Sequence, residues 1–172
     1  MSQVVSEPPF VADEREMLLA YLQRQRDLVL WKLGGLSDHD AARVATTSGL
    51  TIHGIVYHLT DVERSWVRRW FAGRRGLHID GVDEFHVGPP RDLTGARLKE
   101  LLAGYVEESR RCDEVVREHS LDDLEVKGGR SLRWILHHLV EETSRHLGHL
   151  DLLCELADGR TGEGPEPSGG VR

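Results

Sequence analysis

A glutamate and a histidine near the end of the chain are spaced so that both side chains can reach one metal ion. Glu142 and His146 are four residues apart in a segment, residues 132–154, whose apolar residues recur at helical spacing. On that helix His146 falls inside the apolar stripe and Glu142 at its edge, so the two lie one turn apart on one face. Burying either group alone is costly. The pair is therefore expected either to hydrogen-bond internally or to bind a metal ion.

Other polar residues of the same segment flank this pair. His138 and His149 fall at the margin of the same helix face, where each is a candidate substitute ligand, donor to a ligand, or substrate contact. Arg145 either contacts an anionic part of a cofactor or substrate, or is an ordinary solvated helix residue. His137 and Glu141 point away from the apolar stripe and are expected to be solvated.

A metal ion would need a third ligand from another helix, and residues 51–73 offer two candidates. His58 falls at the flank of the apolar stripe of that helix, which is typical of a boundary histidine. Glu63 falls in the middle of the stripe, where a carboxylate must be paired, neutral or metal-bound. Periodicity alone slightly prefers Glu63, and both candidates remain open at this point.

Four amphipathic helices account for nearly all apolar residues, which predicts an all-α protein built as a four-helix bundle. The expected helices span residues 13–34, 51–73, 94–119 and 131–158. Each begins at a residue that favours the N-cap position, namely Asp13, Thr51, Thr94 and Ser131. Trp31 and Trp134 are assigned to the core, and Trp66 and Trp70 to core or dimer packing in preference to a platform for a ligand.

The polar segments between and around these helices define the expected domain organisation. Residues 1–12 form a flexible lead-in, residues 13–158 a single bundle, and residues 159–172 a tail expected to be disordered. Two connections are long for a tight hairpin, which predicts long crossovers in the bundle. The longer one, residues 73–93, is rich in Gly and Pro, and long loops are often functional.

Composition excludes several classes of protein. The chain has 172 residues, enough for one domain, and a net charge of −7, which argues against nucleic acid as a partner. No apolar run approaches the roughly 20 residues of a membrane span. The N-terminus lacks the charged and apolar regions of a secretory signal, so a cytoplasmic location is expected.

Two short motifs carry a resemblance to a known family. The early motif is His58-Leu59-x-x-x-Glu63 and the late one is Glu142-x-x-x-His146-x-Gly148-His149. Together with the helix order and lengths, they resemble the DinB-like (YfiT-like) metalloprotein superfamily. The match looks closest to the actinobacterial DinB-type branch related to mycothiol-dependent maleylpyruvate isomerase and thiol S-transferases.

The resemblance implies a four-helix bundle of the DinB/YfiT type that holds one divalent metal ion, commonly zinc or nickel. Carried over by position, the ligands are His58, Glu142 and His146. Glu63 then becomes a residue that orients a ligand or a buried base. Many members have His at the position of Glu142 and Gln at that of His149. A site of two histidines and one carboxylate admits Zn, Ni, Fe or Mn.

The implied function follows from the open coordination position that three protein ligands leave. A thiol bound there loses its proton and attacks an electrophilic substrate. The resemblance therefore implies a metal-dependent S-transferase or isomerase that uses a low-molecular-weight thiol such as mycothiol, with no catalytic group assigned beyond the activated thiol or water. The alternatives are a non-catalytic metal-binding or stress-associated scaffold and a metal-dependent hydrolase. The resemblance also allows a homodimer.

Overall fold

The described chain is helical, as the sequence predicts. The computed structural model describes residues 4–43, 46–77, 93, 95–162 and 164. In chain order its elements are α1 (Glu14–Leu33), α2 (Asp38–Ala42), α3 (Ile52–Glu63), η1 (Arg64–Phe71), α4 (Leu98–Arg117) and α5 (Leu132–Asp158). Within these residues no strand forms, and the only β-type pairing is one isolated bridge between Leu124 and Ser131. The all-α prediction is thereby confirmed.

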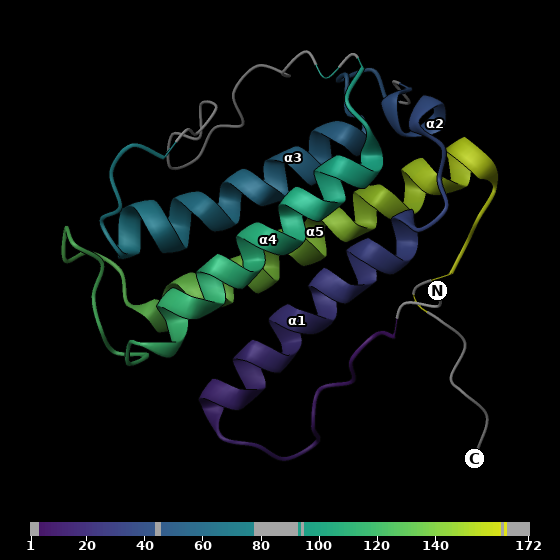
Figure 1. Cartoon of the computed structure of the whole chain (residues 1–172). Coiled ribbons are helices and arrows are strands. Elements are labelled where there is room, and N and C mark those ends of the chain that lie inside the picture. Colours follow the sequence, from purple (N-terminus) through teal and green to yellow (C-terminus); the bar gives the residue numbers. More distant parts are fainter. Residues whose placement is uncertain (1–3, 44–45, 78–92, 94, 163, 165–172) are drawn as a thin grey trace.

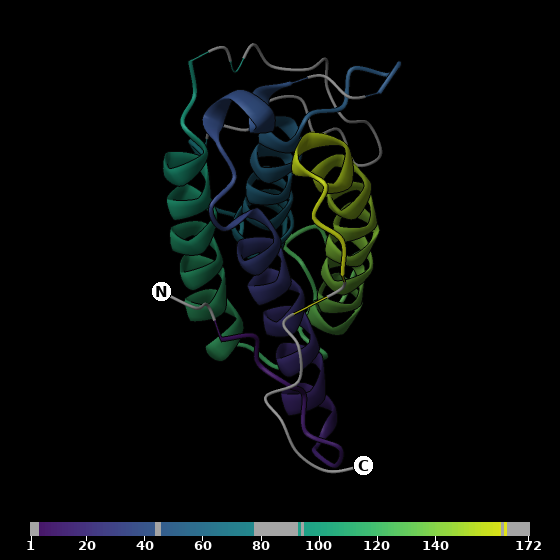
Figure 2. The same cartoon turned by 90° about the vertical axis from the view of Figure 1, so that its right-hand side faces the viewer.

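The long helices lie side by side along their lengths (Figures 1 and 2). Helix α5 packs against α1 on one side and α3 on the other, and α3 also packs against α4. Their apolar faces meet in two clusters, one at each end of the helices. The first includes Leu22, Val62, Val116 and Leu136. The second includes Val29, Ile55, Tyr105 and Leu150.

A layer of buried polar side chains lies between the two apolar clusters. It takes one or two residues from each long helix: Arg26 of α1, Glu63 of α3, Glu108 and Ser109 of α4, and Thr143 of α5. We call these five residues the central polar layer. Buried polar groups are tolerated where they hydrogen-bond to one another. The layer therefore interrupts the apolar core at mid-height, next to the turn of α5 that carries Glu142 and His146.

Three of the long helices, α1, α3 and α5, begin directly after the N-cap residue that the sequence predicts, and α4 does not. The side chains of Asp13, Thr51 and Ser131 each accept a hydrogen bond from a first-turn amide, a contact worth about 1 kcal/mol per helix. Helix α4 begins at Leu98, and Thr94, its predicted cap, lies outside the described residues. The amide of Leu98 donates instead to Asp38 Oδ1, 2.7 Å away. A cap from another helix leaves no local signal in the sequence.

Two further features differ from the sequence prediction. The connection expected at residues 35–50 contains the short helix α2, capped by Ser37. The helix expected over 51–73 continues past Glu63 as a π-helix, η1, whose wider turns often occur at functional sites.

The assignment of Trp134 to the core is wrong. Trp66 is buried, whereas Trp134 is 44 % exposed. Trp134 lies four residues before His138, so it shares the boundary face of α5 instead of the apolar stripe.

Residues 78–92, most of the predicted long connection, lie outside the described residues. In the described part of the chain, no helix is long and apolar enough to cross a membrane.

Candidate metal centre

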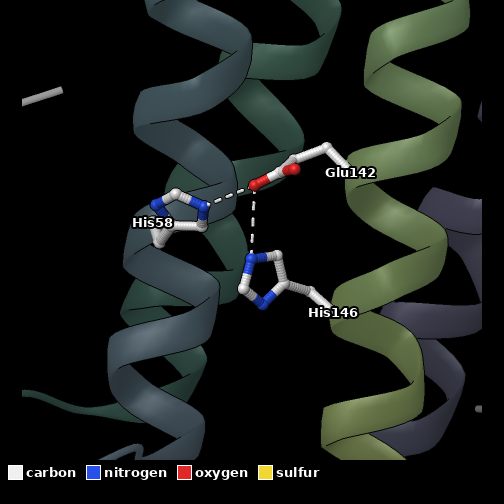
Figure 3. A group of neighbouring side chains, drawn as sticks. All are labelled: His58, Glu142 and His146. Atoms are coloured by element: carbon white, nitrogen blue, oxygen red, sulfur yellow. Dashed lines mark hydrogen bonds and ion pairs between the residues drawn. The ribbon is translucent and has the colours of Figure 1, made fainter. Parts of the chain in front are cut away.

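Helices α3 and α5 bring a histidine, a glutamate and a second histidine together at mid-height. Figure 3 shows His58 reaching from α3 toward Glu142 and His146, which project from successive turns of α5. One ligand atom from each of these three residues lies within 4.8 Å of the others. His58 is 84 residues from Glu142 in sequence, so only the packing of α3 against α5 creates the cluster.

One carboxylate oxygen of Glu142 joins the two imidazoles. Its Oε1 lies 3.0 Å from Nε2 of His58 and 3.3 Å from Nε2 of His146. Hydrogen bonds from His146 and His58 hold the pKa of the Glu142 carboxyl well below its usual range, although partial burial opposes this. The carboxylate is therefore ionised at neutral pH, and two imidazole nitrogens converge on it.

The cluster is shielded from solvent but not sealed. Side-chain exposure is 12 % for His58, 19 % for Glu142 and 10 % for His146. The two histidine rings are in edge contact, with centroids 4.7 Å apart. The donor atoms are therefore mostly buried but keep some contact with solvent.

His149 extends the cluster along α5. Its Nδ1 lies 3.3 Å from Nδ1 of His146, the ring nitrogen that faces away from Glu142. Burial, followed by the neighbouring His146 and Arg145, lowers the pKa of His149. If Nε2 of His146 served as a metal ligand, its Nδ1 would carry the proton, and a neutral His149 could accept a hydrogen bond from it.

Glu63 is buried, as its position in the apolar stripe predicts, and it is paired with a cation. Arg26 Nε and Nη2 donate to the two carboxylate oxygens at 2.8 and 2.7 Å. The Ser109 hydroxyl donates to Oε1 at 3.1 Å. Glu63 thus belongs to the central polar layer. Arg26, its partner, was not among the residues singled out from the sequence, because a helical pattern does not reveal a partner 37 residues away.

The other two predicted flanking residues lie in different surroundings. Arg145 is 60 % exposed and pairs with Glu141 at 2.7 Å, which is the solvated alternative predicted for it. His138 packs against two tryptophans, Trp66 and Trp134. This aromatic contact was not predicted. The spacing of Trp134 and His138, four residues apart, was the available sequence signal.

A comparison with family models assigns the chain to a known family. The family model described as Mycothiol-S-transferase matches residues 17–159, which include every helix from α2 to α5 and most of α1. The chain belongs to the mycothiol S-transferase family. This family is part of the DinB/YfiT-like superfamily, so the resemblance derived from the two motifs is confirmed. Among curated proteins, none matches this mycothiol S-transferase family member.

The donor set of this mycothiol S-transferase family member fits a divalent cation. Two neutral imidazole nitrogens and one carboxylate oxygen are typical ligands of zinc, nickel and iron. The carboxylate supplies negative charge, and each imidazole supplies one lone pair once its proton leaves. The same three side chains form the hydrogen-bonded cluster of Figure 3.

Proposed function

We propose that the protein is a metal-dependent S-transferase that uses mycothiol or a similar low-molecular-weight thiol. The observation that carries the proposal is the convergence of His58, Glu142 and His146 in a chain of the mycothiol S-transferase family. In this proposal the three residues are the metal ligands, zinc or nickel is the ion, and the helices form a four-helix bundle of the DinB/YfiT type. The second substrate is a small electrophile.

The donor distances support these ligands. Donors placed 2.0–2.1 Å from a tetrahedral ion lie about 3.3–3.4 Å from one another. Oε1 of Glu142 lies 3.0 Å from His58 Nε2 and 3.3 Å from His146 Nε2, close to this spacing, and all three ligand atoms lie within 4.8 Å of one another. Three protein ligands leave a coordination position for substrate, the arrangement typical of catalytic sites.

The residues of the chain have separate tasks in this mechanism. A divalent ion, when bound, supplies a positive charge that favours the thiolate form of a thiol. His58 and His146 contribute neutral donors from two helices, and Glu142 contributes the balancing negative charge. His149 fixes the tautomer of His146 so that Nε2 faces the ion. The Arg26–Glu63 pair positions α3, and with it His58, relative to α1.

A thiol-transfer assay with His146→Ala tests the proposal. We expect the protein purified without chelator to contain about one equivalent of divalent metal and to conjugate mycothiol to a reactive electrophile such as an aryl halide. His146→Ala should lose both properties, because it removes a ligand. Metal content is measured by elemental analysis and turnover by loss of free thiol.

The control for this experiment is His137→Ala. His137 is an exposed histidine of the same helix whose Nδ1 donates to a backbone carbonyl, so its loss should change neither readout. Unchanged metal content in His146→Ala would disprove the metal site. Turnover of the electrophile without any thiol would instead indicate a hydrolase.

Metal loading should decrease as the pH is lowered, because protons compete with the ion for the lone pairs of the ligand atoms. Glu142 will not set the pH at which loading falls, because hydrogen bonds from His146 and His58 lower its pKa and keep it ionised in mild acid. We therefore expect the protein to release metal on acidification, through competition at the imidazole ligands and not at the carboxylate. Dialysis at graded pH followed by elemental analysis measures this release. Full retention of metal at pH 4 would contradict imidazole ligation.

A further inference from the structure

His138 is held in one orientation beside the candidate metal centre. It lies four residues before Glu142, so the two side chains occupy successive turns of one helix face, with Cβ atoms about 5–6 Å apart. Its imidazole stacks on Trp134 at 5.3 Å with an interplanar angle of 15°, and it meets Trp66 edge-on at 4.7 Å. Contacts with two indoles restrict the rotation of the ring.

Among the described residues, His138 differs from the other histidines near the centre because neither of its ring nitrogens has a hydrogen-bond partner there. His58 and His146 both point a nitrogen at Glu142, and His149 faces His146. For His138, no hydrogen bond to either ring nitrogen is found within the described residues, and neither nitrogen is among the fully buried, unsatisfied atoms there. The ring is therefore open to accept a proton from a bound molecule.

Burial favours the neutral form of His138, although the two neighbouring carboxylates oppose it more than the two neighbouring arginines support it. Burial is the main cause that lowers its pKa, and Arg130 and Arg145 act in the same direction. Glu142 and Glu141 oppose this effect, and the face of η1 that meets the ring presents Trp66, which is uncharged. Arg130 lies across the cluster, with its guanidinium 5.1 Å from the Trp66 ring and 5.4 Å from the Trp134 ring. A neutral imidazole can act as a base at neutral pH.

Other titratable groups of the core are poorly suited to this task. Burial raises the pKa of both cysteines, Cys112 strongly and Cys154 to about 11. Burial also raises the pKa of Tyr105, which lies on the inner side of the helices. Each of these groups therefore holds its own proton at neutral pH.

We propose that His138 is the catalytic base that accepts the proton of the thiol during S-transfer. The inference rests on the proposed function and adds a residue to it. The thiol S–H bond breaks, its proton moves to a nitrogen of His138, and the sulfur keeps the electron pair. The sulfur then forms a bond to the electrophilic carbon while the bond to the leaving group breaks, and the leaving group takes that electron pair. Protonated His138 then gives its proton to a basic leaving group or, where the leaving group is a halide ion, to solvent water, which restores the neutral ring.

The test compares His138→Phe with His137→Phe in the metal-loaded protein. Phenylalanine preserves the stacking on Trp134 and Trp66 but has no nitrogen, so the helix face stays packed. His137→Phe places the same ring at the exposed neighbouring position. We expect His138→Phe to lower kcat about 10²–10⁴-fold, the usual contribution of a general base. Metal content and thiol affinity should stay within twofold, and His137→Phe should behave like the wild type.

The pH profile separates a catalytic from a structural role. Since burial lowers the pKa of His138, wild-type kcat/KM measured at a pH-independent, full metal occupancy should decline only when the pH falls below the ordinary imidazole range. At the same metal occupancy, His138→Phe should lack this acid limb. Retention of more than half the wild-type kcat by His138→Phe, or an unchanged acid limb, would overturn the assignment. Absence of thiol transfer in the wild-type protein would overturn the proposed function itself and the assignment with it.

Discussion

Glu142→Gln should remove most of the bound metal and abolish thiol transfer. The substitution keeps the shape of the side chain but replaces the only anionic donor of the three-residue cluster with a neutral amide. Loss of a residue that merely orients a ligand costs about 10–100-fold in metal affinity, so loss of a charged ligand should cost at least about 100-fold. Competition with a chromophoric chelator measures the affinity, and elemental analysis measures the occupancy.

Glu141→Gln is the matched control. Glu141 is the preceding residue on the same helix, but it is exposed and pairs with Arg145. The two variants change the net charge equally, so a difference between them reports the position of the carboxylate and not the overall charge. Equal metal affinity in the two variants would show that Glu142 is not a ligand.

Glu63→Ala should destabilise the protein by about 3–5 kcal/mol, because it leaves a buried cation without its main partner. Arg26 and Glu63 have side-chain exposures of 5 % and 2 %. Burial alone would lower the pKa of Arg26, but the attraction and hydrogen bonds of Glu63 outweigh it and raise the pKa. Asp113, the second partner at 2.9 Å, is one-third exposed and should compensate only in part. Urea unfolding followed by circular dichroism measures the change.

Two further variants test the cause of this destabilisation. Glu107 makes exposed ion pairs with Arg110 and Arg111 on α4, so Glu107→Ala should leave the unfolding midpoint nearly unchanged. The double variant Arg26→Met/Glu63→Leu removes both buried charges and should recover most of the stability lost in Glu63→Ala. If the double variant is as unstable as Glu63→Ala, the isolated charge of Arg26 is not the cause.

The helices were predictable because their signals are local. The 3.6-residue periodicity and the caps at Asp13, Thr51 and Ser131 lie within a few residues of the elements that they define. Helix α4 shows the limit of such signals, since its first amide is satisfied by Asp38, sixty residues earlier. The change from α3 to the π-helix η1 likewise has no simple sequence pattern.

The sequence by itself determined that Glu142 and His146 share one helix face, because residues four apart in an α-helix lie one turn apart on the same side. It also determined that Glu63 is buried. It did not distinguish His58 from Glu63 as the residue that meets this pair, and only the resemblance to a family favoured His58. The tertiary structure decided the matter, because the packing of α3 directs His58 toward α5 and Glu63 toward Arg26 of α1. Periodicity specifies which side chains turn inward, whereas partners on other helices depend on how the helices are rotated and packed.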